Sequence, residues 1–341
     1  MDAFERVTRY AEEVITPEEL RDVLEKPTRK AYIGFEPSGL VHTGWIICAH
    51  KIRDLKEAGF EVTVLLADWH AWVNDKMGGS MEAIGDCGEY MKDCFAALGV
   101  EGATYLYASD YVNDARYWEL VLKVAKHASL ARIRRSMDIM GREAAEAEQD
   151  FSKFLYPAMQ VADIFYLDLD LAYGGMDQRH AHMLCRDIAK KMGAKSPVAL
   201  HTPILSSLEA AAGRMDAAKM SKSSPSSCVF IHDSEEQVAQ KLRQAYCPEG
   251  QVEGNPVLEM CRYIVFPATE VFTIARPAKY GGDLSFERYE DLETAFAHRQ
   301  VHPLDLKNAV AVHLNRLLQP VRDYFDRHPE NLDRVRAHLG M

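Results

Sequence analysis

Apolar runs and helical patterns alternate along the first half of the chain. The segment 31–35 predicts a buried strand, and 62–67 is a continuous apolar run, as expected when both faces of a sheet are covered. Between them, from about Gly44 to Gly59, apolar side chains recur at helical spacing. Because strand, helix and strand at this spacing form a βαβ unit, the pattern predicts a parallel sheet.

Further elements continue this alternation and then give way to helices. We expect helices within 1–26, near 81–97, over 153–166 and over 177–192, and strands near 103–108 and 198–205. The stretch 114–147 is helical without clear strands, and we interpret it as an insertion between two halves of the sheet. Helical patterns dominate from 234 onward, apart from a loop rich in proline and glycine near 275–283. The sequence thus predicts an α/β domain at 1–228, with a helical insertion at about 110–150, and a helical domain at 229–341.

Composition excludes several classes of protein. The chain has 341 residues, is 48% hydrophobic and carries a net charge of −11. This excludes a disordered chain and disfavours a protein whose whole surface coats nucleic acid, although a local basic face stays possible. The seven cysteines contain no CxxC pair, which indicates reduced thiols and not a disulfide framework or zinc site. Without a signal-like or membrane-spanning apolar run, we expect a soluble, cytoplasmic protein.

Gly34 and Gly39 give the first candidate motif, because their spacing fits G-x-x-x-x-G. Leu40 follows where a phosphate-binding P-loop needs lysine, and no dinucleotide fingerprint occurs in the chain. A plain strand and turn would explain these glycines equally well.

Two further motifs are informative together. His42-Thr43-Gly44-Trp45 stands at the start of the helix after the first strand, where free backbone N–H groups attract anions. A lone histidine there is more commonly a capping or core residue. Lys219-Met220-Ser221-Lys222-Ser223 offers two cations that can neutralise charge on a leaving pyrophosphate, although it could also be a solvated linker. Both motifs follow strands whose carboxyl ends meet at the ligand-binding edge of a parallel sheet.

These motifs resemble H-I-G-H and K-M-S-K-S, the signatures of class I aminoacyl-tRNA synthetases. Longer segments resemble tyrosyl-tRNA synthetases of the archaeal and eukaryotic type, and the resemblance runs from about 30 to 320. The segments that carry it are 32–39, 66–70, 156–164, 174–179, 246–248, 253–256, 280–283 and 302–307.

The resemblance implies a Rossmann-like catalytic domain followed by an all-helical anticodon-binding domain. It implies a tyrosine–tRNA ligase, which forms tyrosyl-adenylate and pyrophosphate from tyrosine and ATP and then transfers the tyrosyl group to the 3′-terminal adenosine of tRNA(Tyr). It also implies a homodimer, with the insertion as its interface, and Mg²⁺ that arrives with ATP. The alternatives are a synthetase-like RNA-binding paralogue without aminoacylation activity, a small nucleotidylyltransferase, and the tryptophan enzyme of the same subclass.

For the tyrosine substrate, the resemblance implies a set of polar residues in one pocket. A carboxylate and a phenol form a matched acceptor and donor around a phenolic hydroxyl, and phenylalanine would leave them unsatisfied. Spacings of four and three place Tyr156, Gln160 and Asp163 on one helix face. The nearby His70 could equally be a core histidine. The implied residues are Tyr32, Gly34, Glu36, His70, Tyr156, Gln160, Asp163 and Gln178.

For ATP, the resemblance implies the two signature motifs, with Lys219, Lys222 and His42 as catalytic residues. The full implied set is His42, Gly44, Lys219, Ser221, Lys222 and Ser223. Trp45 departs from the signature, whose second histidine stands at this position, and its indole can only donate. We expect no dedicated metal site, because His180 and His182 are two residues apart and diverge on a helix.

For tRNA, the resemblance implies one basic face and one helical site. Arg132, Arg134 and Arg135, with Lys123 and Lys126, form a basic helical face suited to acceptor-stem phosphates, or simply a solvated one. Further positions match the first base pair of the stem and the anticodon, where ring stacking and side-chain hydrogen bonds suit unpaired bases. These positions are Arg179 for the stem, and Tyr280, His302 and Asp305 for the anticodon.

Overall fold

A six-stranded sheet organises the first part of the molecule. The structure, a computed structural model, describes residues 1–141, 150–209 and 225–341. The strand order is β1-β6-β5-β2-β3-β4, in which β1 is antiparallel to β6 and every other pair is parallel. The predicted parallel sheet is therefore confirmed. The strands are β1 (Glu13–Ile15), β2 (Lys30–Phe35), β3 (Glu61–Leu66), β4 (Thr104–Tyr107), β5 (Leu171–Gly175) and β6 (Val198–Thr202).

Two of these strands were not predicted. The segment that contains β1 was expected to be helical, but three of its residues pair with β6 at the edge of the sheet. Strand β5 lies between two predicted helices and pairs with both β2 and β6. Its sequence ends in Gly174-Gly175, and glycine weakens the local signal of a strand. Both strands are fixed by partners distant in sequence.

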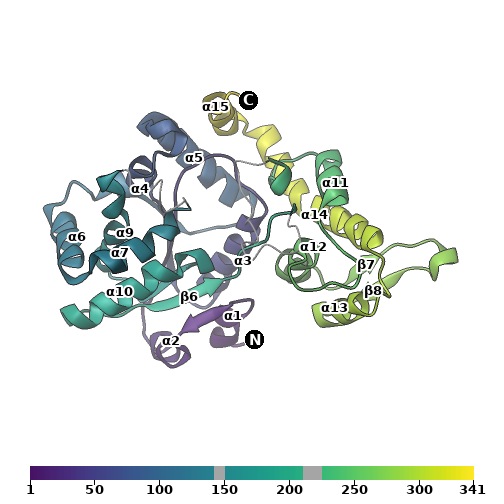
Figure 1. Cartoon of the computed structure of the whole chain (residues 1–341), viewed down its shortest axis with the longest axis horizontal. Helices are drawn as coiled ribbons and strands as arrows, with labels where there is room; N and C mark the ends of the chain where they lie inside the picture. The colour runs from purple at the N-terminus through teal and green to yellow at the C-terminus, as the bar shows by residue number, and fades with distance from the viewer. Residues whose placement is uncertain (142–149, 210–224) are drawn as a thin grey trace.

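Helices cover the sheet and build the rest of the chain. Figure 1 shows α6 and α7, the described part of the predicted insertion, at the opposite end of the molecule from β7 and β8. The helices before residue 200 are α1 (Ala3–Thr8), α2 (Pro17–Leu24), α3 (Gly44–Glu57), α4 (Asp68–Val73), α5 (Met81–Ala97), α6 (Ala115–His127), α7 (Leu130–Ser136), α9 (Tyr156–Tyr166) and α10 (Arg179–Met192). The later ones are α11 (Glu235–Gln244), α12 (Pro256–Met260), α13 (Tyr289–Ala297), α14 (Pro303–Arg327) and α15 (Glu330–His338).

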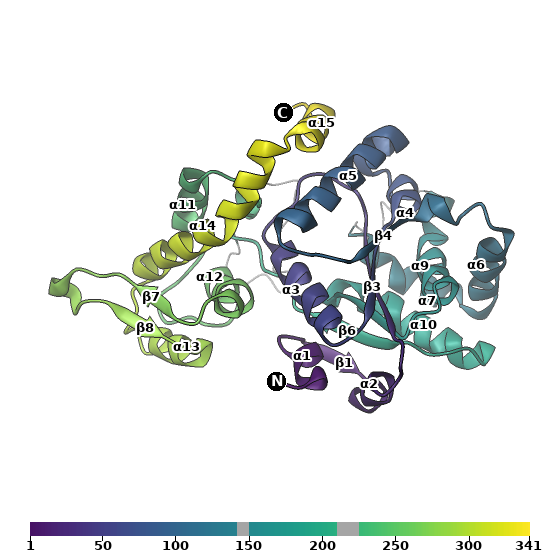
Figure 2. The same cartoon turned by 180° about the vertical axis from the view of Figure 1, so that it is seen from behind.

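The two faces of the sheet bury different side chains because successive residues of a strand point to opposite sides. On β2, Ala31 and Ile33 join a buried cluster with α3 and α5. Tyr32 between them joins a second cluster, formed with α6, α9 and α10. Figure 2 shows α3 and α5 on one side of the central strands and α9 and α10 on the other. Tyr32 thus faces the layer that holds Asp163.

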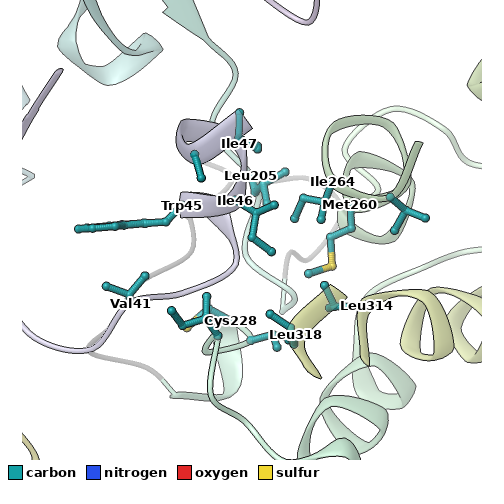
Figure 3. Packing of buried hydrophobic residues seen from close by; sticks show 14 of the residues in the cluster. Val41, Trp45, Ile46, Ile47, Leu205, Cys228, Met260, Ile264, Leu314 and Leu318 are labelled. Carbon is teal, nitrogen blue, oxygen red and sulfur yellow. The ribbon is translucent and has the colours of Figure 1, made fainter. Parts of the chain in front are cut away.

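The C-terminal part packs directly on the α3 layer. Its helices are accompanied by a short antiparallel hairpin of β7 (Phe272–Ile274) and β8 (Leu284–Phe286), an addition to the expected all-helical arrangement. Figure 3 shows Ile46 of α3 and Leu205 close to side chains of the C-terminal helices, and all belong to one buried cluster. Helix α15 returns to α5, where Asn331 Nδ2 donates to Asp93 Oδ2 at 2.7 Å.

Candidate active site

A cavity of about 760 Å³ opens at the carboxyl ends of the parallel strands. Its wall is formed by the residues that end or follow β2, β3, β5 and β6, as expected for ligand sites in α/β sheets. Ten of the predicted site residues line this one cavity. They are Tyr32, Gly34, Glu36, His42, Gly44, His70, Tyr156, Gln160, Asp163 and Gln178.

The deep end of the cavity is built around the carboxylate of Asp163. Tyr32 and Asp163 are each 1% exposed. Carboxylates on helices usually lie at the surface, but Asp163 does not. The Tyr111 hydroxyl donates to Asp163 Oδ1 at 2.7 Å. Burial and the charge of Asp163 together raise the pKa of Tyr32, which keeps its phenol protonated. A phenolic hydroxyl that enters this end meets a charged acceptor and another phenol.

His70 lies against this carboxylate. Its Nε2 lies 3.1 Å from Asp163 Oδ2, and its ring meets the ring of Tyr156 edge-on at 5.1 Å. Burial acts to lower the pKa of His70, but the nearby carboxylates, Asp163 foremost, together outweigh burial and raise that pKa above its ordinary value. His70 is therefore both a buried histidine and a lining residue of the cavity.

Amide side chains form the wall toward the mouth of the cavity. Gln160 Nε2 donates to Gln178 Oε1 at 3.1 Å, and Gln178 Nε2 donates to the carbonyl of Ile139 at 3.3 Å. These two bonds orient Gln160 so that its buried Oε1 has no partner among the described residues. A buried oxygen of this kind is an acceptor suited to a substrate ammonium group.

Two polar side chains fix Glu36. Asn74 Nδ2 donates to Glu36 Oε1 at 2.8 Å, and Lys76 Nζ lies 3.6 Å from Glu36 Oε2. Asn74 also donates to the carbonyl of Met140 at 3.1 Å, so it links Glu36 to the segment whose Ile139 carbonyl accepts from Gln178.

Sequence reasoning missed Tyr111 and Asn74. Tyr111 stands just beyond β4 and Asn74 at the end of α4, the short helix after β3. Their positions after adjacent strands were a usable signal, because the carboxyl ends of parallel strands meet at one edge.

Close contacts explain why β5 ends in two glycines. A Cβ on Gly174 would lie 2.8 Å from Gln178 Cβ, and one on Gly175 would lie 2.7 Å from an oxygen of Asp177. Only glycine lets the turn into α10 approach the strand this closely, and that approach brings Gln178 to the cavity.

The first signature motif lies at the mouth of the cavity. The N–H of Gly44 donates to His42 Nδ1 at 3.1 Å, and a Cβ at residue 44 would lie 2.8 Å from His42 Cε1. Trp45 is 7% exposed, and its ring lies 4.3 Å from Phe35 and 5.2 Å from Phe95, measured between centroids. The departure at position 45 is thus an aromatic core residue. The predicted residues Lys219, Ser221, Lys222 and Ser223 lie outside the described part of the chain.

Arg179 ends a polar chain that leads from the surface to two buried histidines. Its guanidinium makes two bonds to Glu13, at 2.8 and 2.9 Å, and Glu13 Oε2 lies 3.1 Å from His201 Nδ1. His201 Nε2 is 3.0 Å from His182 Nδ1. Because a carboxylate only accepts, Nδ1 of His201 carries the proton, and His182 Nδ1 donates to the neutral ring. Burial lowers the pKa of His182 to about 3 and also lowers that of His201.

We expect this buried pair to destabilise the protein in acid. A histidine whose pKa is 6.5 in the unfolded chain and about 3 in the folded chain stabilises the protein above pH 6.5. This stability is lost as the pH falls below that value. Between pH 7 and 5, His182 alone should lower the free energy of unfolding by about 2 kcal/mol. Urea unfolding at both pH values measures this loss. His182→Asn, whose amide can still donate to His201, should reduce the loss by that amount, and His298→Asn at an exposed site should not. An unchanged loss in His182→Asn would contradict the prediction.

The predicted tRNA residues lie on two separate surfaces. Arg134 and Arg135 are exposed on α7, and Arg132 pairs with Asp187 of α10 at 2.7 Å. At the other end of the molecule, Tyr280 is 63% exposed in the β7–β8 loop. His302 caps α14, accepting from the N–H of Leu304, and Asp305 lies in the first turn of the same helix.

The described residues contain neither a metal-ligating cluster nor a membrane-spanning helix. No cluster of three or more His, Cys, Asp or Glu side chains suited to a metal ion occurs in that part of the chain. No helix at 1–141, 150–209 or 225–341 is long and apolar enough to span a membrane.

Comparison with known proteins identifies the family. The model of the family described as tRNA synthetases class I (W and Y) matches residues 25–319. A tyrosine–tRNA ligase of Aeropyrum pernix is 50% identical over 337 residues, which cover 94% of this chain and 92% of the relative.

Solved structures agree with this result. A crystal structure of tyrosyl-tRNA synthetase from Aeropyrum pernix has a TM-score of 0.89 at 46% identity and covers 99% of this chain and 98% of that one. One from Pyrococcus horikoshii, complexed with L-tyrosine, has a TM-score of 0.91 at 41% identity, with 99% and 100% covered. With the family model, the relative and the solved structures in agreement, this chain belongs to the tyrosyl-tRNA synthetases, within the class I synthetases.

Proposed function

We propose that this protein is a tyrosine–tRNA ligase that joins tyrosine to tRNA(Tyr) at the expense of ATP. The observation that carries the proposal is the buried carboxylate of Asp163 at the deep end of the cavity, surrounded by Tyr32, His70 and Tyr111. A charged acceptor in an aromatic pocket favours a ring that bears a hydroxyl, since a bare ring adds no donor to the acceptor sites that Tyr111 leaves open. Gln160 and Gln178 stand where the substrate ammonium would lie, and Glu36, Gly34 and Tyr156 complete the wall.

The reaction needs no covalent intermediate with the protein. A carboxylate oxygen of tyrosine bonds to the α-phosphorus of ATP as the bond to the β-phosphate oxygen breaks, and pyrophosphate leaves. A ribose hydroxyl of the terminal adenosine then attacks the carbonyl carbon, and AMP leaves. The protein contributes positioning and charge stabilisation. We assign ATP to His42 and Gly44 at the mouth of the cavity and to Lys219, Ser221, Lys222 and Ser223, with His42 and both lysines stabilising charge on the phosphates.

Mg²⁺ fits this scheme as a companion of ATP. Magnesium takes oxygen ligands and is usually held by substrate phosphates with one or two carboxylates. Asp177 supplies such a carboxylate on the cavity wall. When bound, the ion would neutralise part of the charge of the triphosphate.

The remaining parts of the chain suit tRNA and a second subunit. We divide the chain into a catalytic domain at 1–228 and an anticodon-binding domain at 229–341. Arg132, Arg134, Arg135 and Arg179 would meet the acceptor stem, and Tyr280, His302 and Asp305 the anticodon. Leu122 and Leu130 of the insertion are 62% and 58% exposed, which supports a homodimer interface there. The seven cysteines form no disulfide, in keeping with a cytoplasmic location.

Tyrosine-dependent exchange of pyrophosphate into ATP tests the proposal. We expect exchange with tyrosine, and exchange with tryptophan or phenylalanine at least 100-fold weaker, because neither donates a hydroxyl to Asp163. RNA binding without exchange would favour the RNA-binding paralogue. Equal exchange with tryptophan would favour the tryptophan enzyme, and tyrosine-independent nucleotidyl transfer a nucleotidylyltransferase.

A further inference from the structure

The first signature segment is paired with the chain that follows the second signature. The N–H of Thr43 donates to the carbonyl of Val229 at 2.8 Å, and the N–H of Ile231 donates to the carbonyl of Val41 at 3.1 Å. Between these bonds, His42 and Phe230 form an antiparallel bridge. The segment 228–233 begins only a few residues beyond Lys219–Ser223 in the sequence. Val41 and Cys228 from the two segments belong to one buried cluster (Figure 3).

The hydroxyl of Tyr90 on α5 joins these two segments. The N–H of Val41 donates to Tyr90 Oη at 3.0 Å, and Tyr90 Oη lies 2.9 Å from His232 Nε2. Tyr90 is fully buried, and burial lowers the pKa of His232 to about 3, so this imidazole is neutral. With Nε2 assigned as the unprotonated ring nitrogen of His232, the Tyr90 hydroxyl accepts from Val41 and donates to His232.

Helix α14 contacts the same two rings. Phe325 lies 5.7 Å from the ring of Tyr90 and 6.2 Å from the ring of His232, and the second contact is edge-on. One turn earlier, Arg322 Nε donates to the carbonyl of Asp233 at 2.8 Å. The helix that begins next to His302 therefore ends against 228–233, the segment that is paired with His42.

We propose that Tyr90 and His232 are a positioning pair for the use of ATP. They hold 41–44 and 228–233 in a fixed relation and connect both segments to α14 through Phe325. Neither residue lines the cavity, so they act through the backbone around His42 and leave the tyrosine pocket unchanged. The proposal rests on the ATP-binding role proposed above for His42 and Gly44.

Tyr90→Phe tests the pair, because it deletes one oxygen and keeps the ring. It leaves the N–H of Val41 and the nitrogen of His232 without partners. We expect the KM for ATP in pyrophosphate exchange to rise about tenfold, while the KM for tyrosine stays within twofold. Tyr105→Phe is the matched control: its hydroxyl is also buried, has no partner among the described residues, and its ring contacts Phe95 of the same helix. Tyr105→Phe should leave the KM for ATP and the KM for tyrosine unchanged.

Two variants at position 232 separate positioning from simple stability. His232→Leu should match Tyr90→Phe, whereas His232→Gln should restore most of the ATP affinity, because an amide oxygen can accept from Tyr90. A residue needed only for folding would lower the melting temperature and leave the ratio of the two KM values unchanged. That result in folded Tyr90→Phe and His232→Leu would overturn the proposal.

His42→Ala distinguishes failure of the pair from failure of the ATP site. A normal KM for ATP in His42→Ala, with a raised one in Tyr90→Phe, would reject the role of His42 and support the pair. The reverse pattern would support the role of His42 and reject the pair.

Discussion

Asp163→Asn is expected to lower kcat/KM for tyrosine about 100-fold and to leave kcat/KM for phenylalanine almost unchanged. The wild-type carboxylate offers a charged acceptor to the substrate hydroxyl, and it is only 1% exposed. A hydrogen bond of this type contributes about 1.5–3 kcal/mol, and the variant should lose most of it, because its amide is neutral and carries only one acceptor oxygen. Phenylalanine has no hydroxyl and therefore makes no such bond in either protein. The preference for tyrosine over phenylalanine should therefore fall by nearly the same factor of about 100.

The neighbours of Asp163 strengthen this expectation. Tyr111 already donates to Oδ1, and His70 Nε2 lies beside Oδ2. An asparagine directs an N–H₂ group toward one of these donors, which misorients the remaining oxygen. The pKa of His70 should fall in the variant, because the carboxylate that raises it is gone.

Pyrophosphate exchange with each amino acid measures the effect. Asp170→Asn is a matched control, since Asp170 is a buried, ion-paired carboxylate that accepts from the N–H of Lys30 at the opposite end of β2. We expect Asp170→Asn to lower the stability of the protein and to retain the preference for tyrosine. If Asp163→Asn kept the original preference, the assignment of the deep end of the cavity to the substrate hydroxyl would be wrong.

The sequence predicted those parts of the site whose spacing is local. Tyr156, Gln160 and Asp163 share one helix face, and the helix period alone places them together. Gly34 lies near the end of a predicted strand and His42 follows that strand, so both fall at the ligand-binding edge. The motifs after residue 200 followed from the resemblance, and the lysine signature lies outside the described residues.

Contacts between distant segments were not predictable from the sequence. Strand β5 is defined by its ladders to β2 and β6, which no local pattern records. The bond from Tyr111 to Asp163 spans 52 residues, and the polar chain from Arg179 through Glu13 to His201 joins three elements. Such pairs depend on tertiary packing, which local propensity does not encode.

Trp45→His, which would restore the signature residue, is expected to destabilise the protein and to leave the KM for ATP no lower. The indole is 7% exposed and lies against Phe35 of β2 and Phe95 of α5. Replacing a buried tryptophan by a smaller, polar ring removes apolar contact and leaves a cavity, at about 3 kcal/mol. For a chain of 341 residues the melting temperature should fall by roughly 4 °C.

Thermal unfolding and exchange kinetics measured together decide the role of position 45. Trp72→His is the control, because Trp72 is 47% exposed, and we expect its melting temperature to change by only about 1 °C. Trp45→Phe should retain much of the stability, since it keeps an aromatic ring between Phe35 and Phe95. If Trp45→His instead melted like the wild type and bound ATP more tightly, the side chain at 45 would face the phosphates. The stacking on Phe35 and Phe95 leads us to expect the opposite, with His42 as the histidine of this motif that remains at the cavity.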